Sequence, residues 1–250
     1  MSAAPIRFSH LGNLAEPPVI SDIMKVALED KHLLSLAAGF TDTEGLPVKF
    51  IRDAAVSLAT SGKVPEYLQY GTTAGRPKLR KMVARRLSRF DNHQSPSYHP
   101  DNVLLSNGSQ QALYLAVQVL CNPGDIVLVE NPSYFVFLEL LKGQGVQAVG
   151  MPVDAEDEID AEALGNLLDN MEKEGARDRI KAIYIESWFS NPAAHCLSNA
   201  KKAELAEVLK SRELVVPMLE DGAYLELFFE EKYPSRTLFA LRAFDEFPKI

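Results

Sequence analysis

Residues 214–224 read Leu-Val-Val-Pro-Met-Leu-Glu-Asp-Gly-Ala-Tyr, an apolar run that leads directly into two acids and then a tyrosine. The apolar part, 214–219, predicts a buried strand. Asp221 and Tyr224 then follow the carboxyl end of this strand, which is the end where open α/β sheets bind ligands. Because proline interrupts strand pairing, we expect a bulge or a strand end at Pro217.

Apolar runs typical of strands alternate with segments of helical periodicity from Asp53 onward. This alternation predicts an α/β fold with a mainly parallel sheet sandwiched by helices. Residues 1–48, rich in Pro and Gly, are expected to form an N-terminal segment, and 49–250 one large domain. The expected strands are 103–106, 126–129, 146–151, 180–185 and 214–219, and the expected helices are 22–29, 78–89, 109–120, 134–142, 160–174 and 200–210.

The composition is that of a soluble globular protein, with 46% hydrophobic residues, 24% charged residues and a formal net charge of -8. The densest basic cluster, 78–89, has apolar residues at helical spacing, so we interpret its charges as the solvated face of a helix rather than a nucleic-acid surface. Cys121 and Cys196 lack the spacing of metal ligands. No leader peptide or membrane-length apolar run is evident, and we expect a cytoplasmic protein without metal, nucleic-acid or membrane partners.

Gly108, Ser109 and Gln110 join the expected strand 103–106 to the helix that follows it. Gly108 allows a tight turn, and the free N–H groups of the first helical turn favour an anion such as a phosphate. An ordinary N-cap serine explains the same residues equally well.

Tyr134 and Asn191 each follow another expected strand. A tyrosine ring can stack on a planar ligand, although in isolation a core tyrosine is the more common reading. The Asn191 amide can donate to a phenolic oxygen, but Asn-Pro also marks an ordinary turn. Since these segments and 220–224 all follow strands of one sheet, they are expected to converge on one edge.

The order and spacing of these segments resemble the class I/II aminotransferases, which are pyridoxal-phosphate enzymes of fold type I. The resemblance extends over nearly the whole chain and includes Leu-Ala-Ala-Gly-Phe at 36–40, Tyr-Leu-Gln-Tyr-Gly at 67–71 and Gly-Arg-Pro-Lys-Leu-Arg at 75–80. It implies that Gly108, Ser109 and Gln110 bind the phosphate of the cofactor. It also implies that Tyr134 stacks on the cofactor ring.

The same resemblance implies roles for five further residues. Asn191 and Tyr224 match the donors to the phenolic oxygen of the cofactor, and Asp221 matches the partner of its pyridine nitrogen, so Asp221 and Tyr224 are the expected catalytic residues. Gly39 and Asn191 would contact the substrate. Tyr70 would reach the cofactor phosphate of a partner subunit, which implies a homodimer acting on an amino acid and a 2-oxo acid in a biosynthetic process.

Two departures from the family pattern concern the loop around Asn191 and the end of the chain. Ser187 stands where the family commonly has proline, and Ala193-Ala194 where it has Thr-Gly. The lysine that binds the cofactor covalently is expected beyond Ile250, together with the small C-terminal domain. We therefore expect this chain to be the first part of a longer enzyme, either as a fragment or as a naturally shortened product, and to be inactive alone.

Two other functions remain open on the same fold. A lyase or decarboxylase would use the same cofactor residues with different substrate groups. A non-catalytic pyridoxal-phosphate sensor fused to a DNA-binding module is the third hypothesis, and we see no helix-turn-helix pattern before Gly39.

Overall fold

The computed structural model describes residues 7–14, 19–30, 32–34, 39, 41–156 and 158–250. The chain divides into two compact units, residues 17–76 and residues 1–16 with 77–250. The described residues of the first unit form three helices: α1 (Val19–Glu29), α2 (Val48–Thr60) and α3 (Val64–Leu68). The expected helix at 22–29 is therefore confirmed as part of α1.

The second unit is built on a four-stranded sheet in which every neighbouring pair is parallel, with the strand order β2-β1-β3-β4. This confirms the α/β prediction. The strands are β1 (Ile126–Val129), β2 (Gln147–Gly150), β3 (Ile180–Glu186) and β4 (Met218–Asp221). The helices are α4 (Pro77–Phe90), α5 (Ser109–Leu120), α6 (Phe135–Gly143), α7 (Ala161–Lys173) and α8 (Asn199–Ser211). Short 3-10 helices are η1 (Leu11–Asn13), η2 (Pro96–Tyr98), η3 (Pro100–Asn102), η4 (Arg177–Arg179), η5 (Leu238–Ala240) and η6 (Arg242–Phe244).

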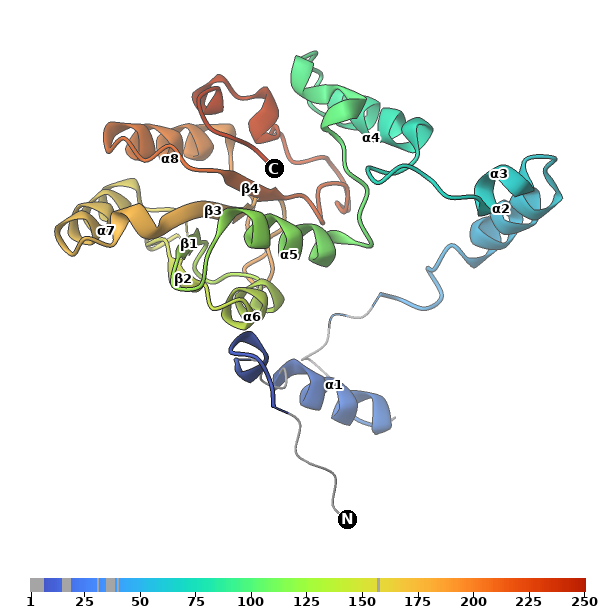
Figure 1. Ribbon diagram of the computed structural model, residues 1–250, viewed down its shortest axis with the longest axis horizontal. Helices are drawn as coiled ribbons and strands as arrows, with labels where there is room; N and C mark the ends of the chain where they lie inside the picture. Colours follow the sequence, from blue (N-terminus) through green and yellow to red (C-terminus); the bar gives the residue numbers. More distant parts are fainter. Residues whose placement is uncertain (1–6, 15–18, 31, 35–38, 40, 157) are drawn as a thin grey trace. The chain divides into compact units, whose positions relative to one another are not determined.

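Helices cover both faces of the sheet (Figure 1). Successive side chains of a strand point to opposite faces, so Ile126 and Leu128 of β1 pack with α7 and α8, whereas Val127 and Val129 pack with α5 and α6. All four residues are at most 3% exposed. This double burial explains why the strands read as continuous apolar runs.

Side chains at the helix starts fix where α7 and α8 begin. Oδ1 of Asp160 accepts from the N–H of Ala163 over 2.9 Å, and Oγ of Ser198 accepts from the N–H of Lys201 over 3.1 Å. Each cap satisfies one of the four N–H groups that a helix start leaves free.

The expected strand at 103–106 is wrong, because this extended segment has no strand alongside it within the described part of the chain. A β-strand needs backbone hydrogen bonds to a neighbour, which an apolar pattern alone cannot supply. An open groove of about 760 Å³ runs beside it, lined by apolar residues that include Leu104, Val119 and Ile250.

The expected strand at 214–219 is displaced toward its carboxyl end, since β4 begins only at Met218. Pro217 directly precedes it, as expected for a residue that cannot donate to the ladder. Consequently Glu220 and Asp221 lie within β4 rather than after it. The outer edge of β4 is paired with the end of the chain, where the N–H of Ile250 donates to Met218 over 2.9 Å.

Helix α4 confirms the helix expected at 78–89, and its charges are largely solvated. Nε of Arg86 donates to Glu226 over 2.8 Å, and both side chains are more than 40% exposed. Among the apolar residues of α4, Ala84 is buried, whereas Leu79 and Met82 are exposed.

Candidate functional site

The start of α5 has the properties of an anion site. Gly108 is its N-cap, with φ 87° and ψ 167°, and no side chain of the described residues caps this helix start. Oγ of Ser106 donates to the carbonyl of Gly108 over 2.9 Å, and the N–H of Asn107 donates to Gln111 over 2.6 Å, so the turn is held in shape. A Cβ placed on Gly108 would meet no atom within 4 Å. Ser109 and Gln110, the first residues of the helix, are exposed, so an anion could reach the free N–H groups of this helix start.

Tyr134 lies beside this turn at the start of α6. Nε2 of Gln110 is 3.5 Å from its hydroxyl oxygen, and Gln110 is exposed rather than turned into the core. Burial raises the pKa of Tyr134, and the nearby Tyr224, Asp221 and Glu186 raise it further. The turn expected to bind the phosphate and the residue expected to stack on the ring are therefore close together.

Asp221 ends β4 with both carboxylate oxygens engaged. Its Oδ2 accepts from the hydroxyl of Tyr184 over 3.1 Å, and its Oδ1 accepts from the N–H of Ala223 over 2.9 Å. Tyr184 is fully buried and its ring stacks on Phe137 with the centroids 4.0 Å apart. The carboxylate is thus held from the sheet on one side and from the following turn on the other.

Asn191 and Tyr224 come from the loops that follow β3 and β4. The N–H of Asn191 donates to Oε2 of Glu186 over 3.1 Å. Tyr224 is half-buried in the turn after Asp221, where its carbonyl accepts from Leu227 over 2.9 Å. No hydrogen bond joins Asn191 to Tyr224 among the residues described, and the two expected donors to the phenolic oxygen come from different loops.

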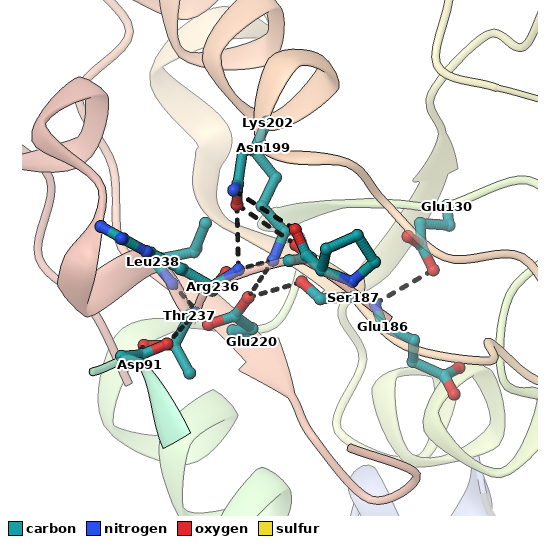
Figure 2. Close-up of polar contacts among 12 residues, drawn as sticks. Asp91, Glu130, Glu186, Ser187, Asn199, Lys202, Glu220, Arg236, Thr237 and Leu238 are labelled. Carbon is teal, nitrogen blue, oxygen red and sulfur yellow. Dashed lines mark hydrogen bonds and ion pairs between the residues drawn. The ribbon is translucent and has the colours of Figure 1, made fainter. Parts of the chain in front are cut away.

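Two carboxyl groups that sequence reasoning missed lie at the same edge. Glu130 follows β1 and Glu186 ends β3, and Oε2 of Glu130 accepts from the N–H of Glu186 over 3.0 Å (Figure 2). Burial raises the pKa of Glu130 to about 8 and that of Glu186 to about 7. Both could have been found by the rule that singled out Asp221, because each stands at the carboxyl end of an apolar run.

A second missed group is the buried polar cluster around Glu220, the neighbour of Asp221. Figure 2 shows Lys202 and Ser187 meeting at its carboxylate, with Nζ of Lys202 2.9 Å from Oε1. The side chains of Lys202 and Glu220 are 0% and 5% exposed. Burial lowers the pKa of Lys202, and the attraction of Glu220 opposes this shift. The N–H of Leu238 also donates to Glu220 over 2.8 Å, so the cluster ties β4 to η5.

The loop after β3 departs from the family pattern at Ser187 and at Ala194. Ser187, where the family commonly has proline, donates its hydroxyl to Glu220. Ala194, where glycine is common, has φ 57°, in the left-handed region that favours glycine.

Two expected site residues belong to the other compact unit. Gly39 is described and exposed, whereas Leu36, Ala37, Ala38 and Phe40 lie outside the described residues. Tyr70 is 100% exposed. The expected contact of Gly39 with the substrate and that of Tyr70 with the cofactor phosphate of a partner subunit remain predictions.

Comparison with known proteins assigns the family. The model described as aminotransferase class I and II matches residues 31–246. This chain belongs to the class I and II aminotransferases. It is 30% identical over 227 residues to aromatic-amino-acid aminotransferase 1 of Thermococcus litoralis, covering 91% of this chain and 51% of that protein.

Two further similarities concern a structure and a regulator. The crystal structure of Pyrococcus horikoshii kynurenine aminotransferase, solved with pyridoxamine phosphate (PMP), superposes with a TM-score of 0.76 and 27% identity, covering 94% of this chain and 55% of that one. The uncharacterized HTH-type transcriptional regulator YdcR of Escherichia coli is 26% identical over 211 residues, covering 84% of this chain and 42% of that protein. The chain thus spans about half the length of the curated relatives it matches.

Pyridoxal phosphate is the cofactor that this aminotransferase family implies, and the residues present suit it. The uncapped start of α5 offers N–H donors to a phosphate, with open space at Gly108. Asp221 offers a fixed carboxylate to a protonated ring nitrogen. Among the described residues, no helix is both long and apolar enough to cross a membrane.

Proposed function

We propose that this chain is the pyridoxal-phosphate-binding part of an aminotransferase that moves an amino group between an amino acid and a 2-oxo acid. The observation that carries this proposal is the placement of Asp221. Its carboxylate is fixed by Tyr184 and Ala223 at the same sheet edge as Tyr134, which in turn lies beside the uncapped start of α5.

When bound, pyridoxal phosphate supplies an electron sink that makes the Cα–H of an attached amino acid acidic. In this proposal the N–H groups at Ser109 and Gln110 bind the phosphate, and Tyr134 stacks on the ring. Asp221 holds the proton on the pyridine nitrogen, which its negative charge stabilises.

The phenolic oxygen is the third point of attachment in this proposal. Asn191 donates to it from its side-chain amide, and Tyr224 from its hydroxyl. Asn191 also helps to orient the substrate, and Gly39 contributes a backbone contact. Both loops that supply these donors are fastened to the ends of β3 and β4, which supports a fixed orientation of the ring.

The lysine that moves the Cα proton is proposed to lie outside this chain. Lys232 and Lys249, the two lysines that follow Asp221 in this chain, donate their Nζ groups to the carbonyls of Phe90 and Phe244, over 2.6 and 2.5 Å. Lys202 is buried against Glu220. These contacts favour a lysine elsewhere in the complete protein and an inactive chain on its own.

The finer parts of the proposal concern assembly and location. We propose a cytoplasmic homodimer with a role in biosynthesis, in which Tyr70 of each subunit reaches the phosphate turn of the other. Residues 1–48 would act as the substrate lid and 49–250 as the cofactor domain. The full exposure of Tyr70 is consistent with a contact that the single chain lacks.

Calorimetric titration of the chain with PMP tests the proposal, because PMP needs no lysine to bind. We expect saturable binding of one PMP per chain, and binding of pyridoxamine, which lacks the phosphate, weaker by at least about 10-fold. Equal affinity for both ligands would contradict the phosphate site, and no binding of PMP would contradict the function. An amino-acid/2-oxo-acid exchange assay on the complete protein separates transamination from lyase chemistry.

A regulatory function is the second candidate, because the chain is similar to the regulator YdcR. A sensor would bind PMP in the same way but would not exchange amino groups. The complete protein would then bind the cofactor, retain no transferase activity and bind DNA.

A further inference from the structure

The loop that presents Asn191 is closed by its own backbone. The N–H of Ser190 donates to His195 over 2.9 Å, and the N–H of Ala194 returns to Ser190 over 2.6 Å. The N–H of Leu197 donates to Ser187 over 3.0 Å at the base of the loop. These bonds fix the shape of the loop, but none of them involves the backbone of Asn191.

Asn191 is instead anchored by a side chain. Its N–H donates to Oε2 of Glu186 over 3.1 Å, and Glu186 is the last residue of β3. The N–H of Glu186 is in turn bound by Oε2 of Glu130 over 3.0 Å (Figure 2). A chain of contacts therefore runs from the end of β1 through Glu186 to Asn191.

Glu186 also stands next to Asp221 in the sheet. The two residues are register partners in the parallel pair of β3 and β4, so their side chains share one face. Tyr184, two residues earlier on that face, donates to Asp221. The anchor of Asn191 and the expected partner of the pyridine nitrogen are therefore fixed on the same two strands.

The burial of the Glu186 carboxyl group costs folding free energy, and an ordinary contact within a loop does not account for this cost. The residue is 3% exposed, and its Oε1 has no hydrogen-bond partner in the described part of the chain. A buried polar atom without a partner destabilises the fold. Without Glu186, the N–H of Asn191 would lose its partner. Asn191, which is expected to hold the phenolic oxygen of the cofactor, would then no longer be anchored.

We propose that Glu186 is a positioning residue, whose carboxyl group holds the backbone of Asn191 so that the Asn191 amide meets the phenolic oxygen of the cofactor. This inference rests on the proposed function. Glu186 does not itself touch the cofactor. It acts through the hydrogen bond to Asn191.

The test uses the complete protein, PMP as the probe and two readouts. One is the affinity for PMP, and the other is the pH at which the absorbance of bound PMP reports ionisation of its phenol. Glu186→Leu removes the acceptor, whereas Glu186→Gln keeps one. We expect Glu186→Leu to weaken PMP binding by about 10-fold and to move the absorbance midpoint to higher pH, because the phenolate loses a donor. Glu186→Gln should stay within about 3-fold of the parent.

A double-mutant cycle with Asn191→Ala links the effect to Asn191. We expect Asn191→Ala to shift the midpoint in the same direction, and the double variant Glu186→Leu/Asn191→Ala to show no further shift, since both changes remove one donor. Additive shifts would overturn the proposal. So would an unchanged midpoint in Glu186→Leu.

Cys196→Ala is the matched control, because Sγ of Cys196 accepts from the N–H of Phe189 over 3.2 Å in the same loop without touching Asn191. The Cys196→Ala variant should leave the absorbance midpoint unchanged. A shift equal to that of Glu186→Leu would show that any loosening of the loop has this effect, and it would contradict the proposal. If Glu186→Leu does not fold, Glu186→Asp gives the same test, because the shorter side chain cannot reach Asn191. Absence of PMP binding in the complete parent protein would instead reject the proposed function, together with the inference that depends on it.

Discussion

The hydroxyl group of Tyr184 in β3 donates a hydrogen bond to Oδ2 of Asp221 in β4 over 3.1 Å. The tyrosine is rigid, because it is fully buried and stacked on Phe137. The N–H of Ala223 engages the other oxygen of Asp221. The carboxylate is therefore oriented before any ligand arrives, and a preorganised charge lowers the cost of binding.

Tyr184→Phe should weaken PMP binding by about 3- to 10-fold, since the ring remains but the donor to Asp221 is lost. The free energy of unfolding should fall by no more than about 1.5 kcal/mol. The control is Tyr98→Phe, which removes a comparable hydroxyl that donates to Asp91. This variant should lose stability while it keeps its affinity for PMP, as measured by urea unfolding and calorimetry. Equal PMP affinities in both variants would contradict the role of Tyr184.

Asp221→Ala in the complete protein should lower kcat by at least about 100-fold, a loss typical of removing one strong electrostatic group. The effect should exceed any change in substrate binding, because the charge on the pyridine nitrogen matters most in the transition state. Steady-state kinetics measure both. Asp178→Ala, on an exposed residue of η4, is the control, and near-normal turnover of Asp221→Ala would refute the cofactor assignment.

Gly108→Ala should weaken PMP binding by about 10-fold or more, because a φ of 87° with a ψ of 167° is open only to glycine. The turn must change shape to accept a Cβ, although the surrounding space is empty. Gly124→Ala is a close match, with φ 94° and no atom within 4 Å of its Cβ, but it precedes the opposite end of β1. Both variants should be destabilised, and only Gly108→Ala should lose affinity.

Ala194→Gly should raise the free energy of unfolding by about 0.5–1 kcal/mol, because it relieves a φ of 57° in the Asn191 loop. Ala203→Gly is the control with the opposite expected effect, because a glycine inside α8 should lower the free energy of unfolding by about 1 kcal/mol. Urea unfolding of both variants measures the difference. A loss of stability in Ala194→Gly would show that the loop tolerates alanine without strain.

Stability should fall as the pH rises from about 5 to 8. Burial raises the pKa of Glu130 to about 8 and that of Glu186 to about 7. Because the folded state then binds more protons than the unfolded state, the stability from each carboxyl is full at low pH and is lost as the pH passes its folded pKa, with a slope of up to about 1.4 kcal/mol per pH unit. Glu130→Gln should flatten this slope in urea unfolding between pH 5 and 8.5, whereas Glu213→Gln, on an exposed residue, should not.

The buried strands were predictable because their signal is local. The strand 126–129 was placed to the residue, since both of its faces are buried and every side chain is apolar. The helices at 160–174 and 200–210 agree with α7 and α8 to within one residue at each end, where Asp160 and Ser198 cap the helix starts in the structure. The position of Asp221 at the ligand-binding edge of the sheet could be predicted, because the carboxyl ends of parallel strands lie at one edge.

Segment 103–106 shows where a local pattern fails. Its residues have the apolar character of a strand, but strand formation depends on a hydrogen-bonded neighbour that the pattern cannot reveal. The start of β4 shows the same limit, because Leu214, Val215 and Val216 are apolar yet lie before the strand. Pro217 marked the boundary, but only the ladder with β3 shows on which side of it pairing occurs.

The sequence by itself determined the parallel α/β fold and the identity of Gly108, Tyr134, Asn191, Asp221 and Tyr224 as candidates, because periodicity and residue chemistry are properties of short segments. The tertiary structure alone revealed how these residues are held. Tyr184 and Asp221 are 37 positions apart in the chain, and Glu130 and Glu186 are 56 apart, yet each pair shares a hydrogen bond. Such contacts depend on which strands become neighbours and in which register, and this is settled by burial and pairing across the whole sheet.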